Sequence, residues 1–201
     1  MASRAERLSR REIALAIPFL PFLGRSGPRQ AAAYSTAILL RHAEKDAGSD
    51  PKEKDPGLSQ AGRERALALR RLLARAGATH LFASEYRRTR ETLVPLAEEG
   101  PLEIAVTPAA DVKGLVDRIR ALPAGSVAVA AGHSNTVPAI VIALGGSMKD
   151  LLSTPGGPAL RDDEYARLFV LTWPAEGPAI AAEDEPLRKP AASSIELSYG
   201  A

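Results

Sequence analysis

Histidine and arginine occur together in the sequence, and both side chains suit the chemistry of a phosphoryl group. The clusters are Arg41-His42, Arg88 and Gly132-His133. A guanidinium presents a planar fork of N–H donors that matches phosphate oxygens. A neutral imidazole can attack phosphorus as a covalent nucleophile, and neighbouring cations keep it neutral by lowering its pKa. Phosphoryl transfer needs mainly positioning and charge stabilisation, so these side chains would suffice without a metal.

Each cluster lies just after a short apolar segment that predicts a buried strand. These segments are residues 36–40 (TAILL), 79–83 (THLFA) and 126–131 (SVAVAA). Helical periodicity separates them, and this alternation is typical of an α/β fold. Because open α/β sheets bind ligands beyond the carboxyl ends of their strands, we expect the three clusters to meet in one pocket.

The remaining elements are predicted from apolar periodicity and from residues that start or stop helices. Ser59 can cap a helix that runs to about Ala76, where Gly77 fits the stop. Pro95 marks a kink or a boundary in the helix after the second strand. Further helices are expected at 89–99, at 112–122 and from the residue after Ser134 to about 144. Further strands are expected at 103–106 and 165–172, and loop-rich chain at 145–158.

The positive charge of the chain is concentrated at its start. The first 33 residues carry six arginines and two glutamates, a local +4 that leaves −2 of the total +2 for the remaining chain. A mildly acidic body is a poor footprint for nucleic acid, so no nucleic-acid partner is expected. The sequence has no cysteine, which excludes disulfides, a thiolate nucleophile and cysteine-ligated metal sites.

Residues 1–33 are typical of a secretory signal peptide. A basic start precedes the apolar run 13–23, and Ala31-Ala32-Ala33 offers a small-residue cleavage site. The run is too short to span a bilayer, so we expect no stable membrane insertion after processing. Arg10-Arg11 resembles a twin-arginine export motif. We therefore expect export to the periplasm or the extracellular space. The alternative is that residues 1–33 are not a signal but an N-terminal extension that is disordered or docked on the surface, in which case the protein would be cytoplasmic.

Four motifs, in order along the chain, resemble those of the histidine phosphatase superfamily, the group that contains the cofactor-dependent phosphoglycerate mutases. They are Leu39-Leu40-Arg41-His42-Ala43-Glu44-Lys45, Leu58-Ser59-x-x-Gly62-Arg63, Ser84-x-x-x-Arg88-Thr89-x-x-Thr92 and Gly132-His133-Ser134-Asn135-Thr136. The resemblance is closest to the small phosphohistidine-phosphatase-like members of branch 1. It implies a three-layer sandwich with a mostly parallel central sheet and helices on both faces, over residues 34–174, followed by a loosely held tail at 175–201.

The resemblance also implies roles for individual side chains. His42 would be the phosphorylated nucleophile. The phosphoryl group and its transition-state charge would be bound by Arg41, Arg88 and His133. The spacing within the second arginine motif selects Arg88 rather than Arg87.

Members of this superfamily usually have a carboxylic acid that protonates the leaving group. Asp111 lies where that acid is expected, between the second arginine motif and the second histidine motif, although it could instead cap the helix at 112. Glu44 and Glu85 are alternatives close to the other motifs. Gly48 stands where many members carry a phosphate-contacting asparagine, and Ala43 replaces the commoner glycine.

The sequence thus predicts a phosphatase that hydrolyses phosphomonoesters or phosphoramidates through a phosphohistidine intermediate. Its substrate would be a phosphorylated small molecule or a phosphoprotein, and no cofactor or metal is expected, since three scattered histidines make a poor metal site. Mutase activity is disfavoured because the long insertions of true mutases are absent. The alternative is a catalytically silent module that recognises phosphate. Specificity is expected to come from loops 47–57 and 145–158.

Overall fold

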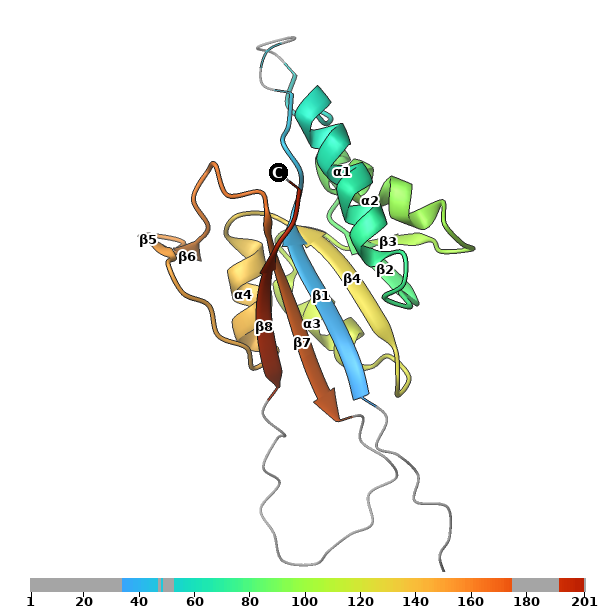
Figure 1. The fold of residues 1–201 in the computed structure, drawn as a ribbon. Helices are drawn as coiled ribbons and strands as arrows, with labels where there is room; N and C mark the ends of the chain where they lie inside the picture. Colours follow the sequence, from blue (N-terminus) through green and yellow to red (C-terminus); the bar gives the residue numbers. More distant parts are fainter. Residues whose placement is uncertain (1–33, 47, 49–52, 175–191, 201) are drawn as a thin grey trace, which may run out of the picture. The chain divides into compact units, whose positions relative to one another are not determined.

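The computed structural model describes residues 34–46, 48, 53–174 and 192–200 (Figure 1). The predicted signal segment 1–33 and most of the predicted tail lie outside these residues. No helix in the described part is long and apolar enough to cross a membrane.

The fold is built on a sheet of six strands in the order β3-β2-β4-β1-β7-β8. β1, β2, β3 and β4 run parallel to one another, whereas β7 is antiparallel to β1 and β8 is antiparallel to β7. The predicted, mostly parallel sheet is confirmed. Their bounds are β1 Tyr34–Arg41, β2 His80–Ala83, β3 Ile104–Val106, β4 Val127–Gly132, β7 Arg167–Pro174 and β8 Ser193–Ser198.

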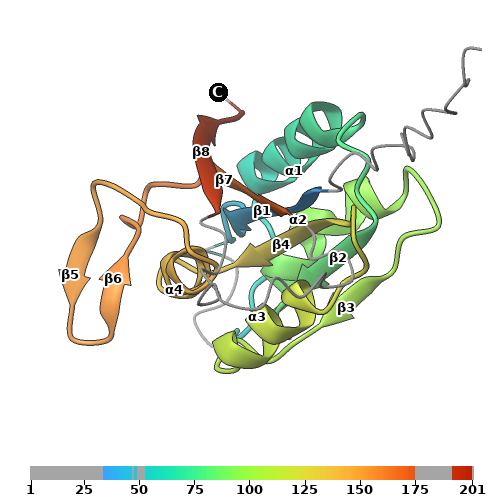
Figure 2. The same cartoon turned by 90° about the horizontal axis from the view of Figure 1, so that it is seen from below.

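Helices cover both faces of the sheet, which gives the expected three layers (Figure 2). The helices are α1 Gln60–Leu73, α2 Arg87–Ala97, α3 Val112–Arg120 and α4 Thr136–Ala143. Along β1, Ala37 and Leu39 pack with α3 and α4, whereas Ile38 and Leu40 pack with α1 and α2. Burial on both faces explains why the parallel strands read as continuous apolar runs.

Pro95 lies inside α2, in its last turn. Pro95 has no N–H to donate to the carbonyl of Glu91, and the helix ends two residues later. The helix boundary expected at Pro95 is thus within two residues of the observed end of α2 at Ala97.

Two segments differ from the sequence-based expectation. Within the loop-rich stretch 145–158, β5 (Leu152–Thr154) and β6 (Gly157–Ala159) form an antiparallel hairpin that stands beside the main sheet (Figure 2). The loosely held tail at 175–201 is wrong for residues 193–199, because β8 pairs with β7 along six residues and Tyr199 is buried behind it. All six residues of β8 are exposed, so the strand gives no strong apolar signal. Backbone hydrogen bonds to β7 and the ion pair of Glu196 with Arg167 hold it in place.

The register of the sheet brings distant motifs together at one edge. In the parallel pair of β1 and β4, Arg41 lies opposite Gly132. The backbone N–H of His42 donates to the carbonyl oxygen of Gly132 at 2.9 Å, which extends the pairing one residue further. On the other side of β4, Ala83 at the end of β2 lies opposite Ala131. The three predicted clusters therefore emerge from neighbouring strand ends.

Tyr199 offers a test of how firmly the C-terminal strand is attached. Its side chain is 6% exposed, and its hydroxyl has no hydrogen-bond partner among the described residues. We expect Tyr199→Ala to lower the free energy of unfolding by about 3 kcal/mol through lost apolar packing. Tyr199→Phe should leave it unchanged or raise it by about 1 kcal/mol, since it removes an unsatisfied buried hydroxyl. Urea unfolding measures both; a loose tail would make both substitutions silent.

Candidate active site

A pocket of about 560 Å³ opens at the carboxyl ends of β1, β2 and β4. Four of the predicted site residues line it together: Arg41, His42, Arg88 and His133. The rest of the lining consists of Lys45, Glu85, Tyr86, Ala109, Ala110, Ser134, Asn135, Thr136 and Asp162. None of the described residues of loops 47–57 and 145–158 is among them, so the walls come from the strand ends and from the segments that follow them.

His42 is held as a neutral imidazole with one nitrogen free. Its Nδ1 lies 2.7 Å from the carbonyl oxygen of Ala43, and because a carbonyl only accepts, Nδ1 must carry the proton. Burial, reinforced by the charges of Arg41 and Arg88, lowers the pKa of His42 to about 3. The lone pair of the neutral ring therefore resides on Nε2, as a nucleophile requires.

The loop behind His42 is fixed by close contact with the start of α1. The backbone N–H of Ser59 donates to the carbonyl oxygen of Glu44 at 2.9 Å, and the Ser59 hydroxyl caps α1 by accepting from the N–H of Gly62. A Cβ atom at position 62 would collide with the same carbonyl oxygen. The glycine of the second motif is therefore needed for this close approach.

Arg41 is clamped from behind by the segment that precedes β7. Its Nη1 donates to the carbonyl oxygens of Arg161 at 2.7 Å and Asp162 at 3.0 Å. The guanidinium carbon lies 4.2 Å from the centre of the Tyr165 ring, a cation–π contact. These contacts fix the orientation of a side chain that is almost fully buried.

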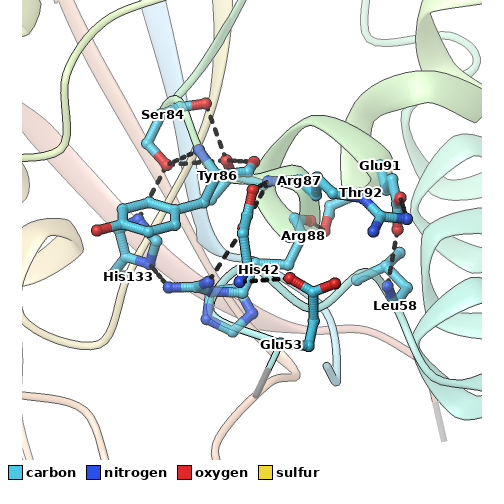
Figure 3. Close-up of polar contacts among 12 residues, drawn as sticks. His42, Glu53, Leu58, Ser84, Tyr86, Arg87, Arg88, Glu91, Thr92 and His133 are labelled. Carbon is cyan, nitrogen blue, oxygen red and sulfur yellow. Dashed lines mark hydrogen bonds and ion pairs between the residues drawn. The ribbon is translucent and has the colours of Figure 1, made fainter. Parts of the chain in front are cut away.

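Arg88 is clamped in a similar way from α2 and the loop before α1. Its Nη1 lies 3.6 Å from the carboxylate of Asp55, and its guanidinium carbon lies 4.3 Å from the ring centre of Tyr86. Its Nη2 lies 3.5 Å from Nδ1 of His133, which links it to the second histidine (Figure 3).

Both arginines retain an unused donor. The Nε atoms of Arg41 and Arg88 are buried and have no hydrogen-bond partner among the described residues. These Nε atoms are shielded within the pocket wall, whereas the two guanidinium side chains themselves line the pocket and place positive charge beside it. Two fixed guanidiniums select for an anion such as a phosphoryl group.

His133 is oriented through Ser84 at the end of β2. Its Nε2 lies 2.9 Å from the hydroxyl oxygen of Ser84, which in turn lies 2.9 Å from the hydroxyl of Thr89 (Figure 3). The ring centre of His133 lies 5.4 Å from that of His42. Burial, with the charge of Arg88 as the next cause, lowers the pKa of His133 to about 4, so this ring is also neutral near pH 7.

The three candidate acids occupy different environments. Asp111 precedes α3 and caps it by accepting from the N–H of Gly114 at 2.9 Å, and it does not line the pocket. Glu85 does line the pocket, with one carboxylate oxygen accepting from the N–H of Ala109 at 2.7 Å. The structure thus brings Glu85, rather than Asp111, to the other four site residues.

Glu44 points away from the pocket into an ion pair. Arg65 donates to both oxygens of its carboxylate, at 2.7 to 3.0 Å, and also to the carbonyl oxygens of Tyr199 and Gly200. Burial opposes ionisation of Glu44, but the hydrogen bonds from Arg65 hold the pKa of its carboxyl below the usual range. A carboxylate held in this way is a poor proton donor near pH 7.

Sequence reasoning missed Asp55, Tyr86 and Tyr165, which hold the two arginines. Tyr86 lies inside the second arginine motif, so its position was a usable signal, whereas Asp55 and Tyr165 are recognisable only from packing. Gly48 is exposed and does not line the pocket. No group of three or more potential metal-binding side chains is present in the described part of the chain.

The lowered pKa values of the two histidines make stability depend on pH. The unfolded chain takes up protons as the pH falls below about 6.5, whereas folded His42 and His133 resist protonation down to about 3 and 4. Stability contributed by the neutral rings is therefore complete above pH 6.5 and is lost progressively below it. As the pH is lowered from 6.5 to about 4, we expect the free energy of unfolding to fall less in the double variant His42→Gln, His133→Gln than in the parent. Denaturant unfolding of both proteins at several pH values in this interval measures the difference. If the free energy of unfolding falls equally with pH in both proteins, the expectation is wrong.

Comparisons with known proteins agree with the geometry. The sequence model of the histidine phosphatase superfamily (branch 1) matches residues 37–111. A solved structure from Agrobacterium tumefaciens, named as a candidate phosphohistidine phosphatase SixA, is 26% identical, with a TM-score of 0.52 over 68% of this chain and 90% of that chain. None of the curated proteins matches the sequence.

Two further structures share the fold at lower identity. The protein histidine phosphatase SixA complexed with tungstate has a TM-score of 0.58 at 14% identity, over 81% of this chain and 96% of that chain. A protein named mycobacterial hydrolase 2 has a TM-score of 0.56 at 17% identity, over 84% of this chain and 93% of that chain. The motif order and the pocket agree with the family match, so over residues 37–111 the chain resembles branch 1 of the histidine phosphatase superfamily.

Proposed function

We propose that the protein is a metal-independent phosphatase that hydrolyses phosphomonoesters or phosphoramidates through a phosphohistidine on His42. The observation that carries this proposal is that Arg41, Arg88 and His133 line one pocket with His42, whose proton on Nδ1 leaves the lone pair on Nε2. The family match and the phosphatase names of the similar structures support the same chemistry.

In the proposed reaction the phosphoryl group binds between the two arginines. Nε2 of His42 attacks phosphorus, and the bond from phosphorus to the leaving oxygen or nitrogen breaks with proton transfer to the leaving atom. Water then attacks the phosphohistidine, gives up a proton, and releases inorganic phosphate and free His42. Arg41 and Arg88 stabilise the charge of both transition states, and His133, whose two nitrogens contact Ser84 and Arg88, helps to hold Arg88 in position.

We propose Glu85 as the acid that protonates the leaving group. It is the pocket-lining carboxylate on the β2 side of the site, and Ala109 fixes only one of its oxygens. The same group, once deprotonated, can accept the proton of the attacking water. Asp111, the position that the resemblance favours, caps α3 and does not line the pocket.

His42→Ala tests the covalent mechanism. We expect turnover to fall by about 10³-fold or more while the fold is retained, since the nucleophile is lost. The parent protein, quenched shortly after mixing with substrate, should contain an acid-labile, base-stable phosphoenzyme, detectable with labelled phosphate. Chelation by EDTA should have no effect. Activity that survives in His42→Ala, or that requires a metal, would refute the mechanism; phosphate binding by a parent without turnover would instead indicate a recognition module.

Glu85→Gln and Asp111→Asn form a matched pair for the acid. Loss of a general acid slows a poor leaving group by about 10² to 10⁴ and matters least for a good one. We expect Glu85→Gln to slow an alkyl phosphate far more than p-nitrophenyl phosphate. Asp111→Asn should change both rates equally and slightly. Steady-state kcat of each variant on both substrates measures these effects. If Asp111→Asn, and not Glu85→Gln, selectively slows the alkyl phosphate, the acid is Asp111.

We also propose that residues 1–33 direct export and that the mature enzyme starts near Tyr34. The basic start, the apolar run and the alanine site of the sequence support this. Replacing Arg10 and Arg11 by lysine should trap the precursor in the cytoplasm if the twin-arginine route is used. Cell fractionation with N-terminal sequencing measures the outcome. An intact Met1 or Ala2 terminus in the cytoplasmic fraction would overturn the proposal.

A further inference from the structure

Tyr86 breaks a local rule of helix formation. It occupies the N-cap position of α2, where Ser, Thr, Asp and Asn are preferred, and its side chain makes no capping hydrogen bond. The carboxylate of Asp55 supplies the cap instead, by accepting from the N–H of Arg87 at 3.0 and 3.1 Å. Departures from local folding rules are expected at functional sites, so Tyr86 is a candidate for a functional role.

The ring of Tyr86 lies on the wall of the phosphate pocket. It is perpendicular to the ring of His133, with centres 5.1 Å apart and an angle of 87° between planes, and it carries the guanidinium of Arg88 (Figure 3). Among the described lining residues it is the single aromatic one besides the two histidines. The other lining residues beyond the arginines are small or polar.

A leaving group must depart on the side of phosphorus opposite His42, because displacement by Nε2 is in line. Ring contacts place Tyr86 next to His133, which itself neighbours His42. Glu85, the proposed acid, is its neighbour in sequence and lines the same pocket. Among the described lining residues, the tyrosine ring is the large flat surface that a departing group could contact.

We propose that Tyr86 is a specificity-determining residue that packs against planar, ring-shaped leaving groups, such as a phenol or an imidazole. The proposal rests on the proposed phosphatase function and names the class of substrate. Paired aromatic rings gain energy beyond the area they bury, whereas a saturated ring of similar size gains only the burial. The remaining walls, formed by Ala109, Ala110 and polar side chains, give an aliphatic group little to bind.

The test compares phenyl phosphate with cyclohexyl phosphate. Tyr86→Leu should lower kcat/KM for phenyl phosphate by about two- to tenfold more than for cyclohexyl phosphate, the fold-change expected for a lost ring pair. Tyr86→Phe should retain the parental preference. Because each variant is compared with the parent on the same substrate, the different intrinsic reactivities of the two esters cancel.

Tyr165→Leu is the matched control. Tyr165 carries the guanidinium of Arg41 at 4.2 Å, much as Tyr86 carries that of Arg88, but it does not line the pocket. Its ring centre also lies 6.0 Å from that of His42, so its loss should lower kcat/KM for both substrates equally, as expected for a residue that supports Arg41 and His42 and does not contact the leaving group. If Tyr86→Leu also lowers both equally, Tyr86 is such a support and the proposal is overturned.

A binding experiment separates this proposal from the proposed function. Phenylphosphonate and cyclohexylphosphonate cannot be hydrolysed, so calorimetric titration of the parent and Tyr86→Leu tests ring recognition even if turnover fails. The parent should prefer the phenyl compound, and the variant should lose that preference; an unchanged preference refutes the role of Tyr86. Peptides that contain phosphohistidine or phosphotyrosine then distinguish the two ring types, and a parent that prefers phosphoserine peptide to both would refute ring selection.

Discussion

Parallel pairing of β1 with β4 is the constraint on which the site depends. The register sets Arg41 opposite Gly132, and the hydrogen bond from the His42 N–H continues the ladder one residue beyond the strand. A slip of one residue would send the side chains of β1 to the opposite faces of the sheet. Both faces are buried under helices, so a slip would place side chains of the wrong size on each face, and close packing of the core opposes it. Core packing thereby helps to set the distance between the two histidines.

The site holds concentrated positive charge that the fold must tolerate before any ligand arrives. Each arginine is placed between an aromatic ring and a carboxylate: Arg41 with Tyr165 and Asp162, Arg88 with Tyr86 and Asp55. Both histidines contribute no charge near pH 7, because burial and the guanidiniums lower their pKa values. The donors that face the pocket are therefore oriented in advance, and an arriving anion need not reorganise them.

Much of the fold and of the site could be predicted from local sequence. The apolar runs identified the strands that carry His42 and His133, and motif spacing selected Arg88 over Arg87. The acid was harder, because Asp111, Glu44 and Glu85 differ only in what their carboxylates contact, which sequence does not encode locally. β8 was missed since none of its side chains is buried; the unpaired edge of β7, a tertiary feature, supplies the hydrogen bonds that define it.

The contacts that clamp Arg41 join parts of the chain that are remote in sequence, since the carbonyl that accepts from its Nη1 lies 120 residues away. Contacts of this kind carry a large loop-closure cost and form late, which slows folding. The pairing of β1 with β7 joins segments that are equally remote, so this part of the sheet and the pocket are both complete only in the fully folded chain. Conversely, an anion held by both arginines would bind only the complete native state, so its binding energy would add to the stability of the whole sheet. Substrate abundance would then influence how long each molecule survives proteolysis.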